Sequence, residues 1–164
     1  MTGNKLRGEG IKTLSEMLKV NTTLTELNLK CEDENERREK EGKKEGEMTG
    51  NWIGSKGVKA ISSMLKVNTT LKTLDLSSEE ERRRKRKKKE ERMTGNLIGD
   101  EGVKALCEIL KVKTTLTSLD LRCEKENEKQ KEKKEERTTG NGIGEEEKKM
   151  LRDAWGRRRG KLDI

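Results

Sequence analysis

The chain has 164 residues, of which 44% are charged, with 40 Lys and Arg against 32 Asp and Glu and a formal net charge of +8. The length favours one domain, and the lack of His removes the commonest general base and zinc ligand from the chain. Three cysteines are too few for a disulfide framework, and no apolar run is long enough to cross a membrane, which favours a cytoplasmic protein, with the nucleus as the alternative.

The apolar residues are gathered in blocks that recur along the chain. The tetrapeptide Met-Thr-Gly-Asn begins at residues 1, 48 and 93, and a weaker version begins at residue 138. We therefore divide the chain, a single array over 1–164, into repeats at about 1–31, 48–78 and 93–123 and a partial repeat at 138–164. A recurring unit of this size is typical of a solenoid, in which neighbouring copies share one core.

Each repeat predicts a helix followed by a short strand. In the second repeat, apolar residues between 57 and 67 follow helical spacing, Ser55 is a suitable N-cap, and Asn68 is placed to end the helix in the left-handed conformation. Asp100 occupies the N-cap position of the third repeat. The spacing Leu-x-x-Leu-x-Leu then predicts a strand. The strand leucines are Leu24, Leu27, Leu29, Leu71, Leu74, Leu76, Leu116, Leu119 and Leu121, and the chain ends with Leu162, Asp163 and Ile164.

Charged inserts at 32–47, 79–92 and 124–137 separate the repeats and contain no aliphatic or aromatic residue, so they are excluded from the core. Ser78 followed by three glutamates resembles a helix N-terminus, and we expect the inserts to be partly helical or disordered. The simplest reading is a solvated spacer. The alternative is a polyanion or nuclear-import patch, although no aromatic residue is interleaved for base stacking. Its residues are Arg82, Arg83, Arg84, Lys85, Arg86, Lys87, Lys88 and Lys89.

Taken together, the strand leucines, the Asn-x-Ile-Gly segment, the amphipathic helix and the Asn-x-Thr-Leu turn resemble the leucine-rich repeat of the ribonuclease-inhibitor subtype. This resemblance implies an α/β solenoid with parallel strands on a concave face and helices on a convex face. It also implies that the repeat asparagines hydrogen-bond to the backbone of the loop after each strand. These asparagines are Asn4, Asn51, Asn96 and Asn141. The chain departs from the family pattern in placing an insert between the strand and the asparagine.

In such a fold the residues between the strand leucines face the concave surface, where they line up in rows across the repeats. One row is mildly acidic, with Asn28, Asp75 and Asp120 and an extension at Asp163, and the row beside it is mildly basic. Such a surface suits a protein ligand better than a small molecule, which binds in an apolar pocket. The alternative is that these strand positions are polar only because they face solvent. The predicted contact residues are Glu26, Asn28, Lys30, Lys72, Thr73, Asp75, Ser77, Thr117, Ser118, Asp120 and Arg122.

The sequence thus predicts a non-catalytic scaffold for protein–protein interaction, without cofactor, metal, membrane or small-molecule substrate. No set of nucleophile, base and orienting group is visible in it. Two alternatives remain. The first is association with nucleic acid or another polyanion, or nuclear import, through residues 82–89. The second is regulation of a nuclease or a small GTPase, which rests on analogy with the family alone.

Overall fold

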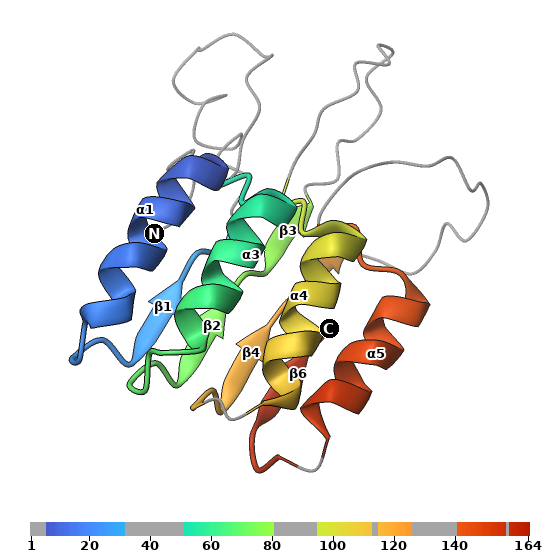
Figure 1. Cartoon of the computed structure of the whole chain (residues 1–164). Helices are drawn as coiled ribbons and strands as arrows, with labels where there is room; N and C mark the ends of the chain where they lie inside the picture. Colours follow the sequence, from blue (N-terminus) through green and yellow to red (C-terminus); the bar gives the residue numbers. More distant parts are fainter. Residues whose placement is uncertain (1–5, 32–50, 81–94, 113–114, 126–140, 157) are drawn as a thin grey trace, which may run out of the picture.

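A computed structural model describes residues 6–31, 51–80, 95–112, 115–125, 141–156 and 158–164. In this part of the chain, four helices and four parallel strands alternate and form two layers (Figure 1). The helices are α1 (Arg7–Val20), α3 (Gly54–Leu65), α4 (Gly99–Lys111) and α5 (Glu145–Trp155). The strands of the main sheet are β1 (Glu26–Asn28), β2 (Thr73–Asp75), β4 (Ser118–Asp120) and β6 (Lys161–Asp163). The fold is therefore a short α/β solenoid.

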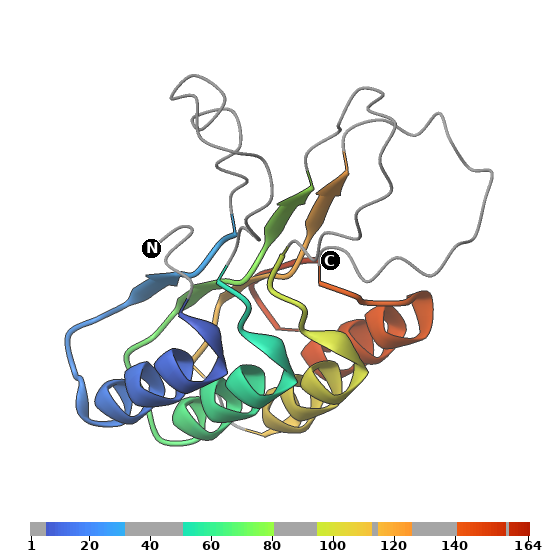
Figure 2. The ribbon, with the colours of Figure 1, turned by 90° about the horizontal axis from the view of Figure 1, so that it is seen from above.

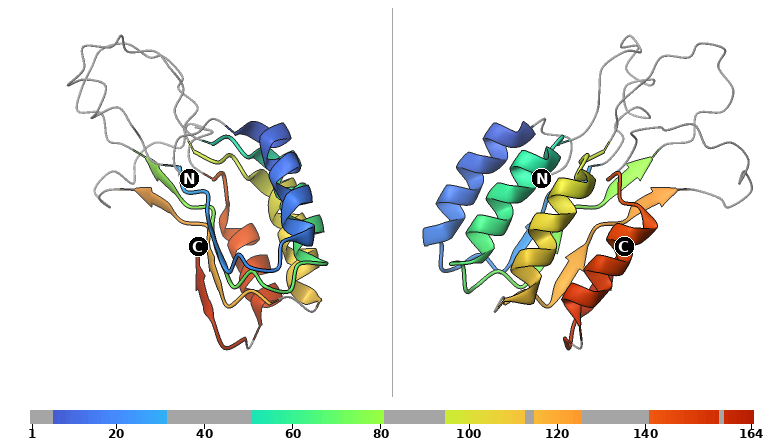
Figure 3. Two further views of the ribbon diagram at one scale, coloured as in Figure 1. Left: turned by 90° about the vertical axis from the view of Figure 1, so that its left-hand side faces the viewer. Right: turned by 45° about the vertical axis from the view of Figure 1, so that its right-hand side comes forward.

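The main sheet follows the order of the repeats. Its strand order is β1-β2-β4-β6, all pairs are parallel, and the central leucines Leu27, Leu74, Leu119 and Leu162 stand in one register. A parallel neighbour requires a crossover connection, which the helix of each repeat supplies. The helices lie side by side on one face of the sheet, and the other face is left uncovered by them (Figures 2 and 3).

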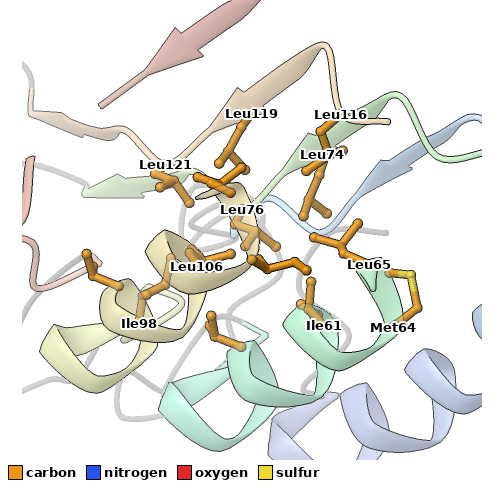
Figure 4. Packing of buried hydrophobic residues seen from close by; sticks show 14 of the residues in the cluster. Ile61, Met64, Leu65, Leu74, Leu76, Ile98, Leu106, Leu116, Leu119 and Leu121 are labelled. Atoms are coloured by element: carbon orange, nitrogen blue, oxygen red, sulfur yellow. The ribbon is translucent and has the colours of Figure 1, made fainter. Parts of the chain in front are cut away.

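The core lies between the two layers. The strands contribute leucines and the helices contribute the apolar side of their 3.6-residue period. Figure 4 shows this packing for the second and third repeats. In the second and third repeats these side chains are fully buried, among them Ile61, Leu74, Leu106 and Leu119. One strand and one helix cannot bury this surface alone, so the repeats stabilise one another by stacking.

A second small sheet extends the strands beyond the predicted boundary. In the described residues, β3 (Ser78–Glu80) pairs in parallel with β5 (Cys123–Lys125), and Cys31 forms an isolated bridge to Ser78. The prediction of a helix N-terminus at Ser78 is therefore wrong. The Ser78 N–H donates to the Arg122 carbonyl of the next repeat at 2.9 Å. At a helix N-terminus this N–H would have no backbone acceptor, so pairing with the next repeat satisfies it in a strand. The remainder of each insert, including Arg82 to Lys89, lies outside the described residues.

The helix ends also differ from prediction. Helices α3 and α4 begin at Gly54 and Gly99, so Ser55 and Asp100 lie inside the first turn and make no capping hydrogen bond. Both glycines have a positive φ, +62° and +61°, which glycine adopts without steric cost. Asn68 is not left-handed. Its Oδ1 accepts hydrogen bonds from the Thr70 and Leu71 N–H groups at 3.0 and 2.8 Å, so its side chain organises the turn into the strand.

Candidate functional site

The uncovered face of the main sheet carries the residues that flank each central leucine. The strand register aligns two rows across it. The first row is Glu26, Thr73, Ser118 and Lys161, and the second is Asn28, Asp75, Asp120 and Asp163. Glu26, Asn28 and Lys161 are exposed and the other members are half-buried. The structure therefore brings together residues that lie about 45 positions apart in the sequence.

A repeated hydrogen bond fixes the first three members of the second row at the ends of β1, β2 and β4. The side-chain Oδ1 of Asn28 accepts from the Lys30 N–H at 2.9 Å, and Asp75 and Asp120 accept in the same way from Ser77 and Arg122. This contact two residues along the chain is a local turn that Asn and Asp favour. It holds the row rigidly, and the second polar atom of each side chain is engaged separately.

Asp75 stands near the middle of the row among neutral donors. Its Oδ2 accepts a hydrogen bond from the Asn28 amide at 3.2 Å, and its Oδ1 accepts one from the Ser77 hydroxyl at 2.6 Å. Among the described residues, the contacts recorded for Asp75 thus come from uncharged groups. These groups orient the carboxylate, and no cation in the described part of the chain forms an ion pair with it.

The next two acids of the row are each paired with a cation two residues away in the chain. The Arg122 guanidinium binds Asp120, with its closest N–O distance at 2.7 Å, and Lys161 lies 2.8 Å from Asp163. Burial alone would raise the pKa of Asp120, but the hydrogen bonds and charge of Arg122, together with the charge of Lys161, outweigh it and hold that pKa below its ordinary value. The row is therefore a sequence of one oriented anion and two internal ion pairs.

Other predicted contact residues occupy different surroundings. Lys72, Thr117 and Arg122 are exposed, and Lys30 is half-buried. Ser77 is only 2% exposed, so its prediction as a contact residue is wrong. The chain at Leu76, Ser77 and Ser78 departs from strict alternation as it passes into the second sheet, and all three side chains are buried.

The repeat asparagines form a buried ladder behind this surface. The Asn51 amide donates to the Leu29 and Lys30 carbonyls, and the Asn141 amide donates to those of Leu76 and Leu121. The Asn96 amide donates to Leu29, Leu76 and Ser77 at 3.1, 2.9 and 3.2 Å. Asn96 and Asn141 thus each reach two successive repeats and fix their spacing. Asn4 lies outside the described residues.

Sequence reasoning missed a second set of hydrogen bonds at the opposite end of the strands. The buried Asn68 amide donates to the Leu18 carbonyl of the preceding helix at 2.7 Å. In the last repeat the Arg158 guanidinium donates to the Leu110 carbonyl, which lies near the end of α4 as Leu18 lies near the end of α1. An arginine can replace an asparagine here because both supply N–H donors to a backbone carbonyl. Nothing in the local pattern around residue 158 identifies this role.

Two shallow hollows lie away from the uncovered sheet face. One of about 450 Å³ is lined by Leu97, Gly99 and Gly142 near the start of α4, and one of about 330 Å³ lies between α3 and α4 beside Lys59 and Glu108. Neither contains a predicted contact residue. Within the described segments, no group of three or more Cys, Asp or Glu residues is placed to hold a metal ion, and no helix there is long and apolar enough to span a membrane.

Comparison with known proteins agrees with this geometry. The model of the leucine-rich repeat family matches residues 47–62, 67–78 and 92–107, which cover helix and strand segments of the second repeat and the start of the third. Searches of curated proteins and of solved structures gave no match.

Proposed function

We propose that this chain is a leucine-rich repeat protein and a non-catalytic scaffold, which binds a protein partner through the uncovered face of its main sheet. Repeats of this family generally act as scaffolds for protein interaction. Stacked strands supply a rigid, extended surface of this kind. Six of the predicted contact residues are aligned by the strand register and support the proposal: Glu26, Asn28, Thr73, Asp75, Ser118 and Asp120. Ser77 is buried and is left out of the proposed contact residues.

The observation that carries the proposal is the oriented carboxylate of Asp75. Two neutral side chains, Asn28 and Ser77, hold it in place, so a cation from outside the chain would meet a preorganised anion. Asp120 and Asp163 already have cationic neighbours and offer a mixed-charge rim. We therefore propose a partner that presents a Lys or Arg side chain to Asp75, surrounded by polar groups.

The test is affinity capture from a nuclease-treated extract. The Asp75→Lys variant places a cation on the sheet face, and Glu108→Lys makes the same charge change at an exposed position on helix α4. Asp75→Asn keeps the Oδ1 acceptor for Ser77 and removes the charge, together with the Oδ2 acceptor for the Asn28 amide. We expect a partner that is lost with Asp75→Lys, weakened with Asp75→Asn and retained with Glu108→Lys. Loss with Glu108→Lys alone would place the partner on the helices and contradict the proposal.

The polyanion hypothesis gives a different result in the same experiment. A variant that lacks residues 81–92 removes the basic run and leaves β3 in place, because β3 ends at Glu80. If capture requires nucleic acid or residues 81–92 and is indifferent to Asp75, the basic run is the binding element and the sheet face is not. Thermal unfolding of each variant establishes that it remains folded.

A further inference from the structure

The two ends of the solenoid leave apolar core positions partly open. The partly buried hydrophobic residues packed on the core are Leu6, Leu14, Leu24, Ile143, Leu162 and Ile164, which belong to the first and last repeats. The positions equivalent to Leu14 in the middle repeats, Ile61 and Leu106, are fully buried. The side chains at the ends therefore have the chemistry of a repeat interface, and each lacks one neighbouring repeat among the described residues.

Met17 shows most clearly how the first repeat differs from the interior repeats among the described residues. Met17 is 63% exposed, whereas Met64 and Ile109, at the same place in the next two repeats, are 0% exposed. Val20, on the same helix, is 81% exposed, but its equivalents Val67 and Val112 are also exposed, at 55% and 52%. Exposure at the position of Val20 is thus shared by the first three repeats, whereas exposure at the position of Met17 is particular to the first repeat among the described residues.

The charges at the two ends are complementary in the register of the sheet. Glu26 is exposed on the outer strand β1, and Lys161 is exposed at the same row position on the outer strand β6. If a second copy continued the sheet, Lys161 of one copy would lie beside Glu26 of the next, a cross-strand pair of opposite sign. Lys161 also contacts Asp163 at 2.8 Å, and it would be shared between the two carboxylates.

The helical layer repeats this complementarity. Lys59 of α3 binds Glu101 of α4 at 3.1 Å across the interior repeat interface. Glu9 occupies the position of Glu101 in the first repeat, and Lys149 occupies that of Lys59 in the last, and both are exposed. Each end of the solenoid therefore carries one half of an ion pair that the interior already makes.

From these observations we infer that the protein associates with itself head to tail, with the C-terminal end of one copy (β6 and α5) docked on the N-terminal end of the next (β1 and α1). A contact between two N-terminal ends is disfavoured, because it would bring Glu9 and Glu26 of both copies together. A heterologous contact of this kind does not close by two-fold symmetry and adds copies in a row.

The interface is weaker than an internal one. Lys148 and Arg152 of α5 stand where Val103 and Cys107 of α4 pack against the next repeat, so two buried positions become charged at the C-terminal end. We therefore expect reversible association that grows with protein concentration and weakens with salt, because exposed ion pairs are screened. This inference is independent of the proposed binding function of the sheet face.

Sedimentation velocity of the full chain over a range of concentrations tests the apolar half of the inference. Met17→Arg places a charge in the proposed interface, and Val20→Arg is the matched control on the same helix. We expect concentration-dependent association in the wild type and in Val20→Arg, and its loss in Met17→Arg. A wild type that remains monomeric throughout the range, or equal behaviour of the two variants, would overturn the inference.

Charge reversal tests the direction of the contact. Glu26→Lys and Lys161→Glu each place like charges at the interface, and we expect each alone to lower the association constant by about two- to fivefold. In an equimolar mixture, the altered N-terminal end of the first variant meets the altered C-terminal end of the second, and the two new charges are opposite in sign. Association therefore returns to at least the wild-type level. If the mixture associates no better than either variant alone, the contact is not head to tail.

Discussion

At the scale of single residues, the buried asparagine amides do more than terminate a loop. The Asn96 amide donates to carbonyls of two neighbouring repeats, at Leu29 and Leu76. This one side chain therefore links two neighbouring strands, which are held together elsewhere by the backbone hydrogen bonds of the sheet. The resemblance to a known repeat pointed to these asparagines, but it did not indicate this bridging. The bridging matters for stability, because each buried hydrogen bond contributes to the free energy of folding.

Replacement of Asn96 by Ala removes three buried hydrogen bonds to the Leu29, Leu76 and Ser77 carbonyls. Each carbonyl keeps one other donor, so the loss is that of the Asn96 contacts alone. We expect the free energy of unfolding to fall by about 2–3 kcal/mol. Asn96→Asp retains the shape but not the N–H donors, so it is expected to be at least as destabilising. Urea unfolding followed by circular dichroism measures both. A nearly neutral Asn96→Asp variant would show that the amide donors are unimportant.

Asp120 makes stability depend on pH. Arg122 holds the pKa of Asp120 below its ordinary value in the folded chain, so the unfolded chain takes up this proton first as the pH falls. The stabilisation is complete above the ordinary pKa of an aspartate, about 4, and is lost as the pH falls through the folded value. Between pH 6 and pH 3, wild type should lose more unfolding free energy than Asp120→Asn. Equal losses in parallel urea titrations would contradict this assignment.

At the scale of the elements, the leucine spacing placed the strands correctly, whereas the helix starts were displaced by one or two residues. Ser55 and Asp100 have the chemistry of caps, but the chain enters each helix through a left-handed glycine and not through a side-chain cap. Capping signals in a sequence describe local preference only. The backbone path from the buried asparagine into the helix decided the boundary.

The left-handed glycines give a prediction for the helix start. An added Cβ at Gly99 would meet no atom within 4 Å, so Gly99→Ala tests the backbone conformation without steric conflict. We expect a loss of about 1 kcal/mol in the free energy of unfolding. Gly8→Ala, inside α1 with ordinary contacts, should instead raise it by about 0.5 kcal/mol. Thermal or urea unfolding that ranked the two variants the other way would contradict the described φ.

The second sheet sets the distance between Cys31 and Cys123. Cys31 and Cys123 lie on opposite sides of Ser78, two strand spacings apart, which is about 10 Å and too far for a disulfide. Cys31 and Cys107 are buried, and burial also raises the pKa of the Cys107 thiol.

A charged thiol reagent should therefore modify the half-buried Cys123 first and reach Cys31 and Cys107 only on unfolding. Mass spectrometry of the native protein at increasing reaction times measures the order, and the same reaction in urea is the control in which all three should react together. Rapid modification of Cys31, or a Cys31–Cys123 disulfide in the monomer, would contradict the strand order.

At the scale of the whole molecule, the repeat period predicted the solenoid because each copy carries the same apolar positions. It could not predict what happens where the period ends. Ser77 was taken as an outward strand residue because alternation was extended one step too far, and it is buried at the passage into β3. The electrostatic difference between members of the second row also could not be predicted from the sequence. Asp75 and Asp120 look equivalent there, and only the folded contacts distinguish an oriented anion from an ion pair.

The account depends most on the sheet face as the binding surface, and one titration tests it directly. With a captured and purified partner, calorimetry compares wild type, Asp75→Lys and the helix control Glu108→Lys at equal salt. We predict an affinity at least about tenfold weaker for Asp75→Lys and an affinity close to that of wild type for Glu108→Lys. If Asp75→Lys, shown to be folded, binds the partner as tightly as wild type, the uncovered face of the sheet is not the binding site.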